Sequence, residues 1–145
     1  MSTGDGLLFV DDEAENVRLL AEILQDSLDI PVVVVDSVEL AVEHLHERTW
    51  RAVIMDLFIP LGDHPDRVLG PRARRYQDDV EHLGGLVLLE EIDRLTHRPL
   101  VLSHTACTDH VLLELFGDRV ARRIPKPSPI DTVLSNVMDV LAASD

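Results

Sequence analysis

Short apolar runs recur along the chain and are separated by longer stretches in which polar and apolar residues mix. Such runs, bounded by polar residues, are typical of strands that are buried on both faces of a parallel sheet. The run that ends at Met55 is fully apolar and is followed directly by the carboxylate of Asp56. Strands are predicted at residues 7–10, 31–35, 50–55, 99–102 and 120–124. The last of these contains Arg122 and Arg123, which indicates an edge position.

Between these runs, apolar residues repeat with the three- and four-residue spacing of amphipathic helices. Ser37 and Ser128 precede two such stretches and are suitable N-caps. Helices are predicted at about residues 14–27, 38–48, 86–96, 109–116 and 129–142. Strands that alternate with helices form a parallel sheet with right-handed crossovers and helices on both faces. The sequence therefore predicts one α/β domain over residues 1–145.

The segment from residue 58 to residue 83 does not fit this alternation, because loops in compact α/β units are typically about 2–6 residues long. We interpret about 62–83 as an insert after the third strand, with a short helix of its own at 71–83. Arg72, Arg74 and Arg75 form a basic patch in it. This patch is either a solvated face paired with neighbouring acids, or a docking element for a partner or a lid over the site.

Polar side chains follow several of the predicted strands at the point where each strand ends. Asp11 and Asp12 follow the first strand, Asp56 the third, and Lys126 the fifth. Ser103 and Thr105 both lie near the end of the fourth strand and are alternative sources of a hydroxyl. Because parallel strands end at one edge of the sheet, these side chains should meet where open α/β folds bind ligands.

Carboxylates brought together repel each other unless a cation or protons intervene. Mg²⁺ is the natural cation for such a site, because it prefers carboxylates, waters and phosphate oxygens as ligands. Lys126 could contact a phosphoryl oxygen as a point charge. Asp56 could act as a nucleophile and form an acyl phosphate, a reaction that mostly requires positioning and neutralisation of charge.

Composition restricts the class of protein. The chain carries a formal net charge of −14, which argues against a nucleic-acid partner because phosphate-binding surfaces need an excess of basic residues. The single cysteine, Cys107, cannot form an internal disulfide and points to a reducing compartment. No apolar run approaches the roughly 18 residues of a membrane span, and residues 1–6 lack the features of a signal peptide. A cytoplasmic location is therefore expected.

Several motifs in this order resemble the receiver domain of response regulators in two-component signalling. They cover nearly the whole chain except the insert: Phe9-Val10-Asp11-Asp12-Glu13, Ile54-Met55-Asp56-Leu57 with Pro60, Gly84-Gly85-Leu86, Pro99 with Thr105-Ala106, and Ile124-Pro125-Lys126-Pro127. The resemblance implies a flavodoxin-like, doubly wound (βα)5 fold, of the single-domain CheY-like type, with strand order 2-1-3-4-5.

The resemblance also implies roles for individual residues. Asp56 would be the phospho-acceptor, and Lys126 would contact the phosphoryl group, with a cis bond to Pro127. Asp12, Asp56 and the backbone carbonyl of Phe58 would bind Mg²⁺, while Asp11 would act largely through water. A hydroxyl of the fourth strand would turn inward on phosphorylation.

This sequence departs from the family pattern at three places. The family hydroxyl usually lies five residues after the proline of the fourth strand, a count that gives His104. Thr105 is our preferred switch residue, Ser103 is the alternative, and a substitution by His104 is the third possibility. Arg123 stands where the family often has an aromatic residue, and the insert lies beside the predicted site.

These features predict a stand-alone receiver that accepts a phosphoryl group from a histidine kinase or phosphotransfer protein and signals to a downstream protein in a phosphorelay. It would not be an enzyme beyond its own Mg²⁺-dependent phosphorylation and dephosphorylation. The family often dimerises through the elements predicted at 109–116, 120–124 and 129–142, so a homodimer is an implied possibility.

Two other functions remain open. A hydrolase of the haloacid-dehalogenase type would need a second acid where Phe58 stands, which argues against it. A phosphate-independent interaction module would use the insert as its docking element.

Overall fold

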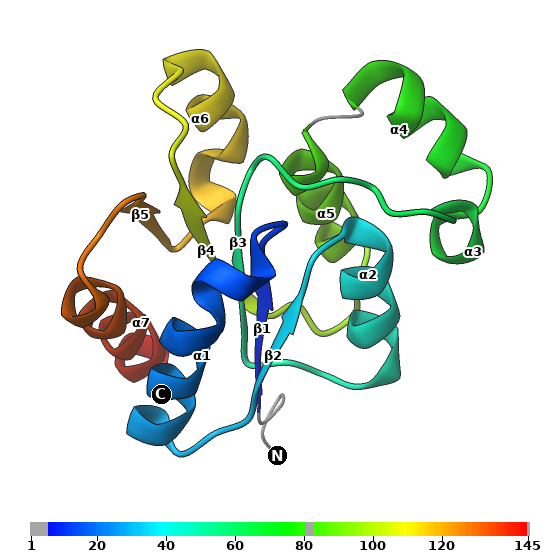
Figure 1. Ribbon diagram of the computed structural model, residues 1–145. Helices are drawn as coiled ribbons and strands as arrows, with labels where there is room; N and C mark the ends of the chain where they lie inside the picture. Colours follow the sequence, from blue (N-terminus) through cyan, green and yellow to red (C-terminus); the bar gives the residue numbers. More distant parts are fainter. Residues whose placement is uncertain (1–5, 81–82, 145) are drawn as a thin grey trace.

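The computed structural model describes residues 6–80 and 83–144 and contains one five-stranded parallel sheet in the order β2-β1-β3-β4-β5 (Figure 1). This order confirms the predicted doubly wound fold. β5 lies at an edge, as its two arginines predicted, and Arg122 donates a hydrogen bond to Asn136 at 2.8 Å. The strands are β1 (Leu7–Val10), β2 (Val32–Val35), β3 (Ala52–Met55), β4 (Leu100–Thr105) and β5 (Arg122–Pro125).

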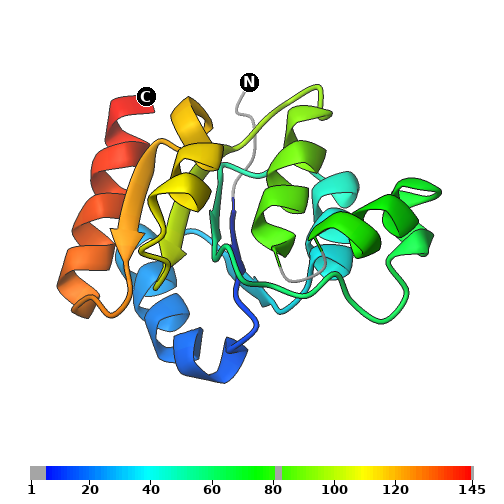
Figure 2. The ribbon, with the colours of Figure 1, turned by 90° about the horizontal axis from the view of Figure 1, so that it is seen from above.

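Helices cover both faces of the sheet (Figures 1 and 2). The first face is covered by α1 (Ala14–Leu28) and α7 (Ile130–Ser144). The second face is covered by α2 (Val38–Glu47), α5 (Gly84–Asp93) and α6 (His110–Phe116), which is followed by the 3-10 turn η1 (Gly117–Arg119). No helix in the described part of the chain is long and apolar enough to cross a membrane.

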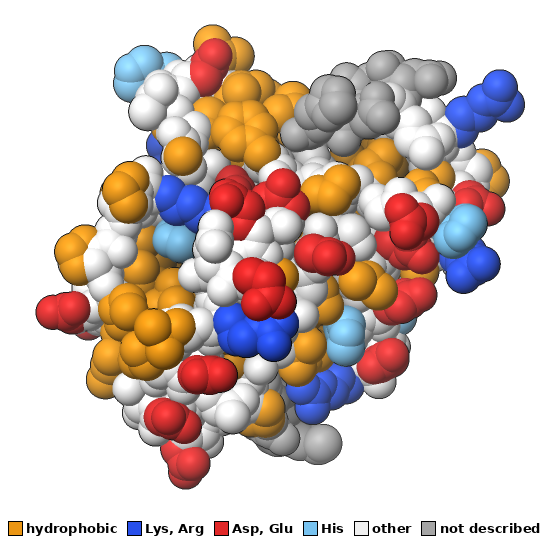
Figure 3. Space-filling view, viewed as in Figure 1, with side chains coloured by type: hydrophobic (Ala, Val, Ile, Leu, Met, Phe, Trp, Pro, Cys, Tyr) orange, Lys and Arg blue, Asp and Glu red, His pale blue; other side chains and the backbone are white. Residues whose placement is uncertain are grey.

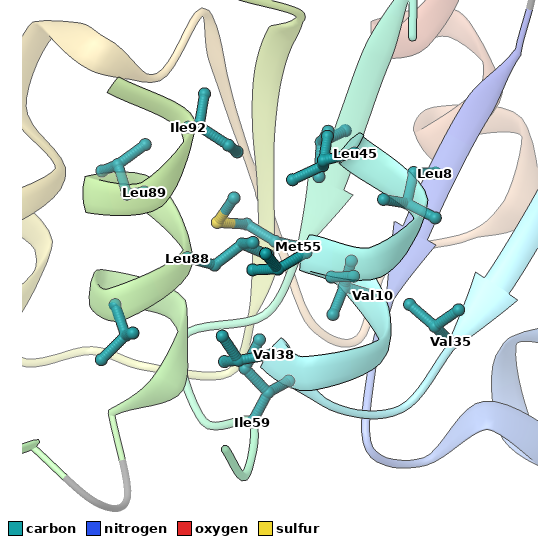
Figure 4. Packing of buried hydrophobic residues seen from close by; sticks show 14 of the residues in the cluster. Leu8, Val10, Val35, Val38, Leu45, Met55, Ile59, Leu88, Leu89 and Ile92 are labelled. Atoms are coloured by element: carbon teal, nitrogen blue, oxygen red, sulfur yellow. The ribbon is translucent and has the colours of Figure 1, made fainter. Parts of the chain in front are cut away.

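The apolar core is split into two clusters by the sheet, because successive side chains of a strand point to opposite faces. Leu7, Phe9 and Ile54 pack in the cluster with α1 and α7. Leu8, Val10 and Met55 pack in the cluster with α2 and α5, where they meet side chains such as Val38, Leu45, Leu88 and Ile92 (Figure 4). Each buried Leu or Ile stabilises the fold by about 1.5–3 kcal/mol, so packing on both faces stabilises the central strands.

The insert forms two helices, α3 (Asp66–Leu69) and α4 (Arg72–Val80), where the sequence predicted one helix over 71–83. Gly70 separates them with φ of +60°, a conformation that favours glycine. The predicted continuation over residues 81–82 lies outside the described residues. Leu69, Ala73 and Tyr76 are buried against the core cluster of α2 and α5. The insert is thus part of the packed domain.

Two glycines hold the loop after β3 against the start of α5. Gly84 and Gly85 donate backbone hydrogen bonds to the carbonyls of Ile59 and Leu57 at 3.0 and 2.9 Å. A Cβ atom at Gly85 would lie 2.5 Å from the backbone carbonyl oxygen of Asp56, so no side chain fits there. The two glycines therefore fix the backbone that carries Asp56.

β4 is longer than predicted. It continues through Ser103, His104 and Thr105, whereas the sequence placed the end of the strand at residue 102. The three residues are polar, which breaks the apolar pattern, but all are buried and the ladder with β5 extends to Thr105 and Pro125. Tertiary pairing has extended the strand beyond the apolar run.

Candidate functional site

Three aspartates meet at the carboxyl edge of the sheet. β1 and β3 are neighbours with Val10 opposite Met55, so Asp11 and Asp56 leave the sheet side by side. Asp11 is fully buried, Asp56 is nearly so, and Asp12 is exposed. One carboxylate oxygen from each of the three lies within 4.8 Å of the others. The predicted convergence of these acids is present in the fold.

Lys126 joins this group from the end of β5. Its Nζ donates to Asp11 Oδ2 at 2.5 Å and to Asp56 Oδ2 at 2.9 Å. Burial alone would lower the pKa of Lys126, but its hydrogen bonds and charge interactions with Asp11 and Asp56 raise it instead. The side chain is therefore an ammonium that partly neutralises two buried carboxylates. The bond from Lys126 to Pro127 is cis, as the resemblance implied.

Backbone donors orient the two buried carboxylates. Asp11 Oδ1 accepts from the N–H of Glu13 at 2.9 Å, and Asp56 Oδ1 accepts from the N–H of Phe58 at 3.3 Å. Each bond leaves the other oxygen of the same carboxylate to face Lys126. Both acids are thus oriented by backbone donors of their own loops.

The donor set suits a hard divalent cation. Lys126 bonds two of the three carboxylates, and burial together with the charges of Asp11 and Asp56 raises the pKa of the third, Asp12. A cation bound here would relieve this repulsion. Asp12 and Phe58 line one cavity of about 430 Å³, with Gly62 and Gln77 among its other residues. The predicted metal ligands are therefore neighbours, and the insert contributes a wall beside them.

The structure separates the three candidates for the switch position on β4. Thr105 Oγ1 accepts a hydrogen bond from the N–H of Cys107 at 3.2 Å. Ser103 is almost fully buried and lies opposite Met55. His104 lines a cavity that also contains Asp11 and Lys126. Among the described residues, neither hydroxyl is hydrogen-bonded to the acids or to Lys126, so the assignment of Thr105 or Ser103 stays a prediction.

The structure gives specific contacts to Arg123 and His104, two of the places where the sequence departs from the family pattern. Arg123, which stands in the place of an aromatic residue, donates to the carbonyl of Leu113 on α6 at 2.9 Å. His104 faces the cluster of α1 and α7, and its ring meets the ring of Phe9 edge-on at 5.8 Å. The five-residue count from Pro99 was the signal that pointed to His104.

Figure 3 shows acidic side chains near the centre of one face of the molecule and a group of hydrophobic side chains beside them over α1 and α7. The exposed apolar residues of these two helices include Leu19 and Ile130, which are 59% and 37% exposed. Both line the cavity that contains Asp11 and Lys126. The site therefore opens beside an apolar surface.

No family model matches the sequence, and no curated protein matches it. Solved structures do match. The signal receiver domain of an HD domain-containing protein from Pseudomonas fluorescens gives a TM-score of 0.72 at 16% identity, over 99% of this chain and 90% of that chain. A CheY-like response regulator receiver domain protein from Methanospirillum hungatei gives 0.72 at 14% identity, over 97% and 95%.

A third match is a CheY-like receiver domain from Methylobacillus flagellatus, with a TM-score of 0.63 at 18% identity, over 94% of this chain and 98% of that chain. At these identities the likeness establishes the fold. The chain has the CheY-like fold of response regulator receiver domains.

Proposed function

We propose that this protein is a receiver that accepts a phosphoryl group on Asp56 in a Mg²⁺-dependent reaction and passes the signal on through protein contacts. The observation that carries this proposal is the group formed by Asp11, Asp12, Asp56 and Lys126 at the carboxyl edge of a CheY-like sheet. The rigid backbone around Asp56 adds to it.

In this reaction an oxygen of Asp56 attacks the phosphorus of the donor. The new P–O bond forms as the bond from phosphorus to the leaving group breaks, and the product is an aspartyl phosphate. The ammonium of Lys126 stabilises the negative charge on the oxygens of the transferred phosphoryl group. Asp12, Asp56 and the carbonyl of Phe58 would hold Mg²⁺, with Asp11 acting through water, and the cation would neutralise charge that builds up during transfer.

The proposed donor is a histidine kinase or a phosphotransfer protein, and the proposed output is a downstream protein target in a cytoplasmic phosphorelay. The apolar side chains of Leu19 and Ile130 beside the site support a protein partner. The net charge of −14 is unfavourable for nucleic acid. Catalysis would be limited to the protein's own phosphorylation and dephosphorylation.

The test is the intact mass after incubation with Mg²⁺ and acetyl phosphate. The protein should gain one phosphoryl group, Asp56→Asn should gain none, and a chelator should abolish the gain. Glu15→Gln is the matched control, because Glu15 is an exposed acid on α1 away from the cluster. If the parent and the Glu15→Gln control both fail to gain mass at saturating Mg²⁺, the proposal is wrong. A phosphate-independent module, with the insert as docking element, then becomes the better hypothesis.

A further inference from the structure

The pairing of β3 with β4 places His104 beside Asp56. Met55 pairs with Ser103, so the next residues on the two strands, Asp56 and His104, are adjacent. Two residues earlier, Ile54 and Leu102 both pack in the cluster of α1 and α7. Because side chains alternate along a strand, Asp56 and His104 point to this same face.

The imidazole is buried without a full set of partners. His104 is 6% exposed, and its Nδ1 atom has no hydrogen-bond partner among the described residues. A buried polar nitrogen without a partner costs free energy and is uncommon in folded proteins. His104 also lines a cavity of about 450 Å³ together with Asp11 and Lys126. The ring is therefore a free hydrogen-bonding group at the edge of the site.

Thr105, by contrast, lies on the opposite side of β4 by the same alternation, and its hydroxyl already accepts from the N–H of Cys107. Burial and the charge of Lys126 lower the pKa of His104. The imidazole carries at least one N–H donor in either protonation state.

We propose that the imidazole of His104 donates a hydrogen bond to the phosphoryl group on Asp56 and so takes the position that a hydroxyl residue was predicted to fill. This inference rests on the proposed function. The imidazole ring of His104 is larger than a hydroxyl group, contacts Phe9 and lines a cavity with residues of α1. Its movement towards the phosphoryl group would therefore couple the site to the face formed by α1 and α7.

The test uses beryllofluoride with Mg²⁺ as a stand-in for the phosphoryl group. We expect the ¹⁵N resonances of the His104 ring to shift on binding. His104→Leu should weaken beryllofluoride binding about tenfold or more, the usual size for a hydrogen bond to a charged group. His104→Gln, which keeps an N–H donor, should recover most of this loss. Glu15→Gln, which changes an exposed acid on α1 away from the cluster, is the matched control. Thr105→Val tests the competing assignment of the switch position.

The outcomes distinguish this inference from the proposed function. If the parent takes up neither beryllofluoride nor a phosphoryl group, the proposed function fails and the role of His104 fails with it. If the parent binds beryllofluoride but His104→Leu binds equally well, or Thr105→Val shows the loss instead, only the role of His104 is wrong. Mg²⁺ affinity and the thermal midpoint of each variant without beryllofluoride show whether the variant is folded.

Discussion

Lys126 illustrates how much a single residue contributes at this site. Its ammonium contacts two carboxylates whose side chains are 0% and 7% exposed, so these buried groups depend on it for a counter-charge. Removing the ammonium would leave these buried carboxylates without a partner, which is strongly destabilising.

We predict that Lys126→Met lowers the free energy of unfolding at neutral pH by about 3–5 kcal/mol, because it leaves buried charges unpaired. Urea unfolding measures this loss, and added Mg²⁺ should recover part of it. Arg18→Met is the control, since the pair of Arg18 with Glu15 is exposed and should be worth less than about 1 kcal/mol. A loss for Lys126→Met no larger than that of the control would contradict the prediction.

At the scale of elements, the insert is attached to α5 through Glu91. This carboxylate is 4% exposed and accepts from Arg72 at 2.7 and 3.1 Å and from the hydroxyl of Tyr76 at 2.9 Å. Burial would raise the pKa of Glu91, but the hydrogen bonds from Arg72 and Tyr76 outweigh burial and lower it. The basic patch predicted as a solvated face or docking element is thus split, with Arg72 turned inward.

We predict that Arg72→Met destabilises the insert by about 1.5–3 kcal/mol, the range for hydrogen bonds to charged groups. Hydrogen exchange should quicken in α4 and at the start of α5 more than in the sheet. Arg74→Met on the same helix is the matched control, because Arg74 is exposed. Equal protection from hydrogen exchange in the two variants would show that the bonds from Arg72 to Glu91 do not hold the insert.

The lowered pKa of Glu91 also gives a prediction for acid. A carboxylate with a depressed pKa contributes to stability at pH values above its ordinary pKa of 4.5. This contribution is lost as the pH falls through the lower pKa of the folded state. Glu91→Gln should therefore be less stable than the parent at pH 7, and the difference should shrink below about pH 4.5. Urea unfolding at several pH values measures it; a constant difference would refute the assignment.

These elements also show what the sequence could and could not predict. The apolar runs predicted the five strands, because burial on both faces leaves a clear pattern. Arg122 and Arg123 predicted the edge position of β5. Asp11, Asp12, Asp56 and Lys126 were predictable because parallel strands bring their ends together. Ser103 to Thr105 were misjudged as following the strand, since pairing with β5 overrides local polarity. The contact of Arg72 with Glu91 joins residues far apart in the sequence and left no local signal.

The molecule as a whole is strongly acidic, and three of its carboxylates meet where the strands end. It carries 27 acidic against 13 basic residues, and within the aspartate cluster a single lysine bonds both Asp11 and Asp56. General salt screens the overall repulsion, whereas a divalent ion bound by the cluster would stabilise only the folded state, in which the three carboxylates meet. The two effects can be separated by comparing salts at equal ionic strength.

We predict that MgCl2 raises the thermal midpoint by about 5–10 °C more than NaCl of equal ionic strength, when Mg²⁺ is about a hundredfold above its dissociation constant. Asp12→Asn should lose most of this difference, and Glu15→Gln should keep it. The gain should also fall as the pH is lowered, because the pKa of Asp12 is raised and a protonated Asp12 competes with the metal. An equal gain from both salts would show that screening alone stabilises the chain and that the aspartates form no metal site.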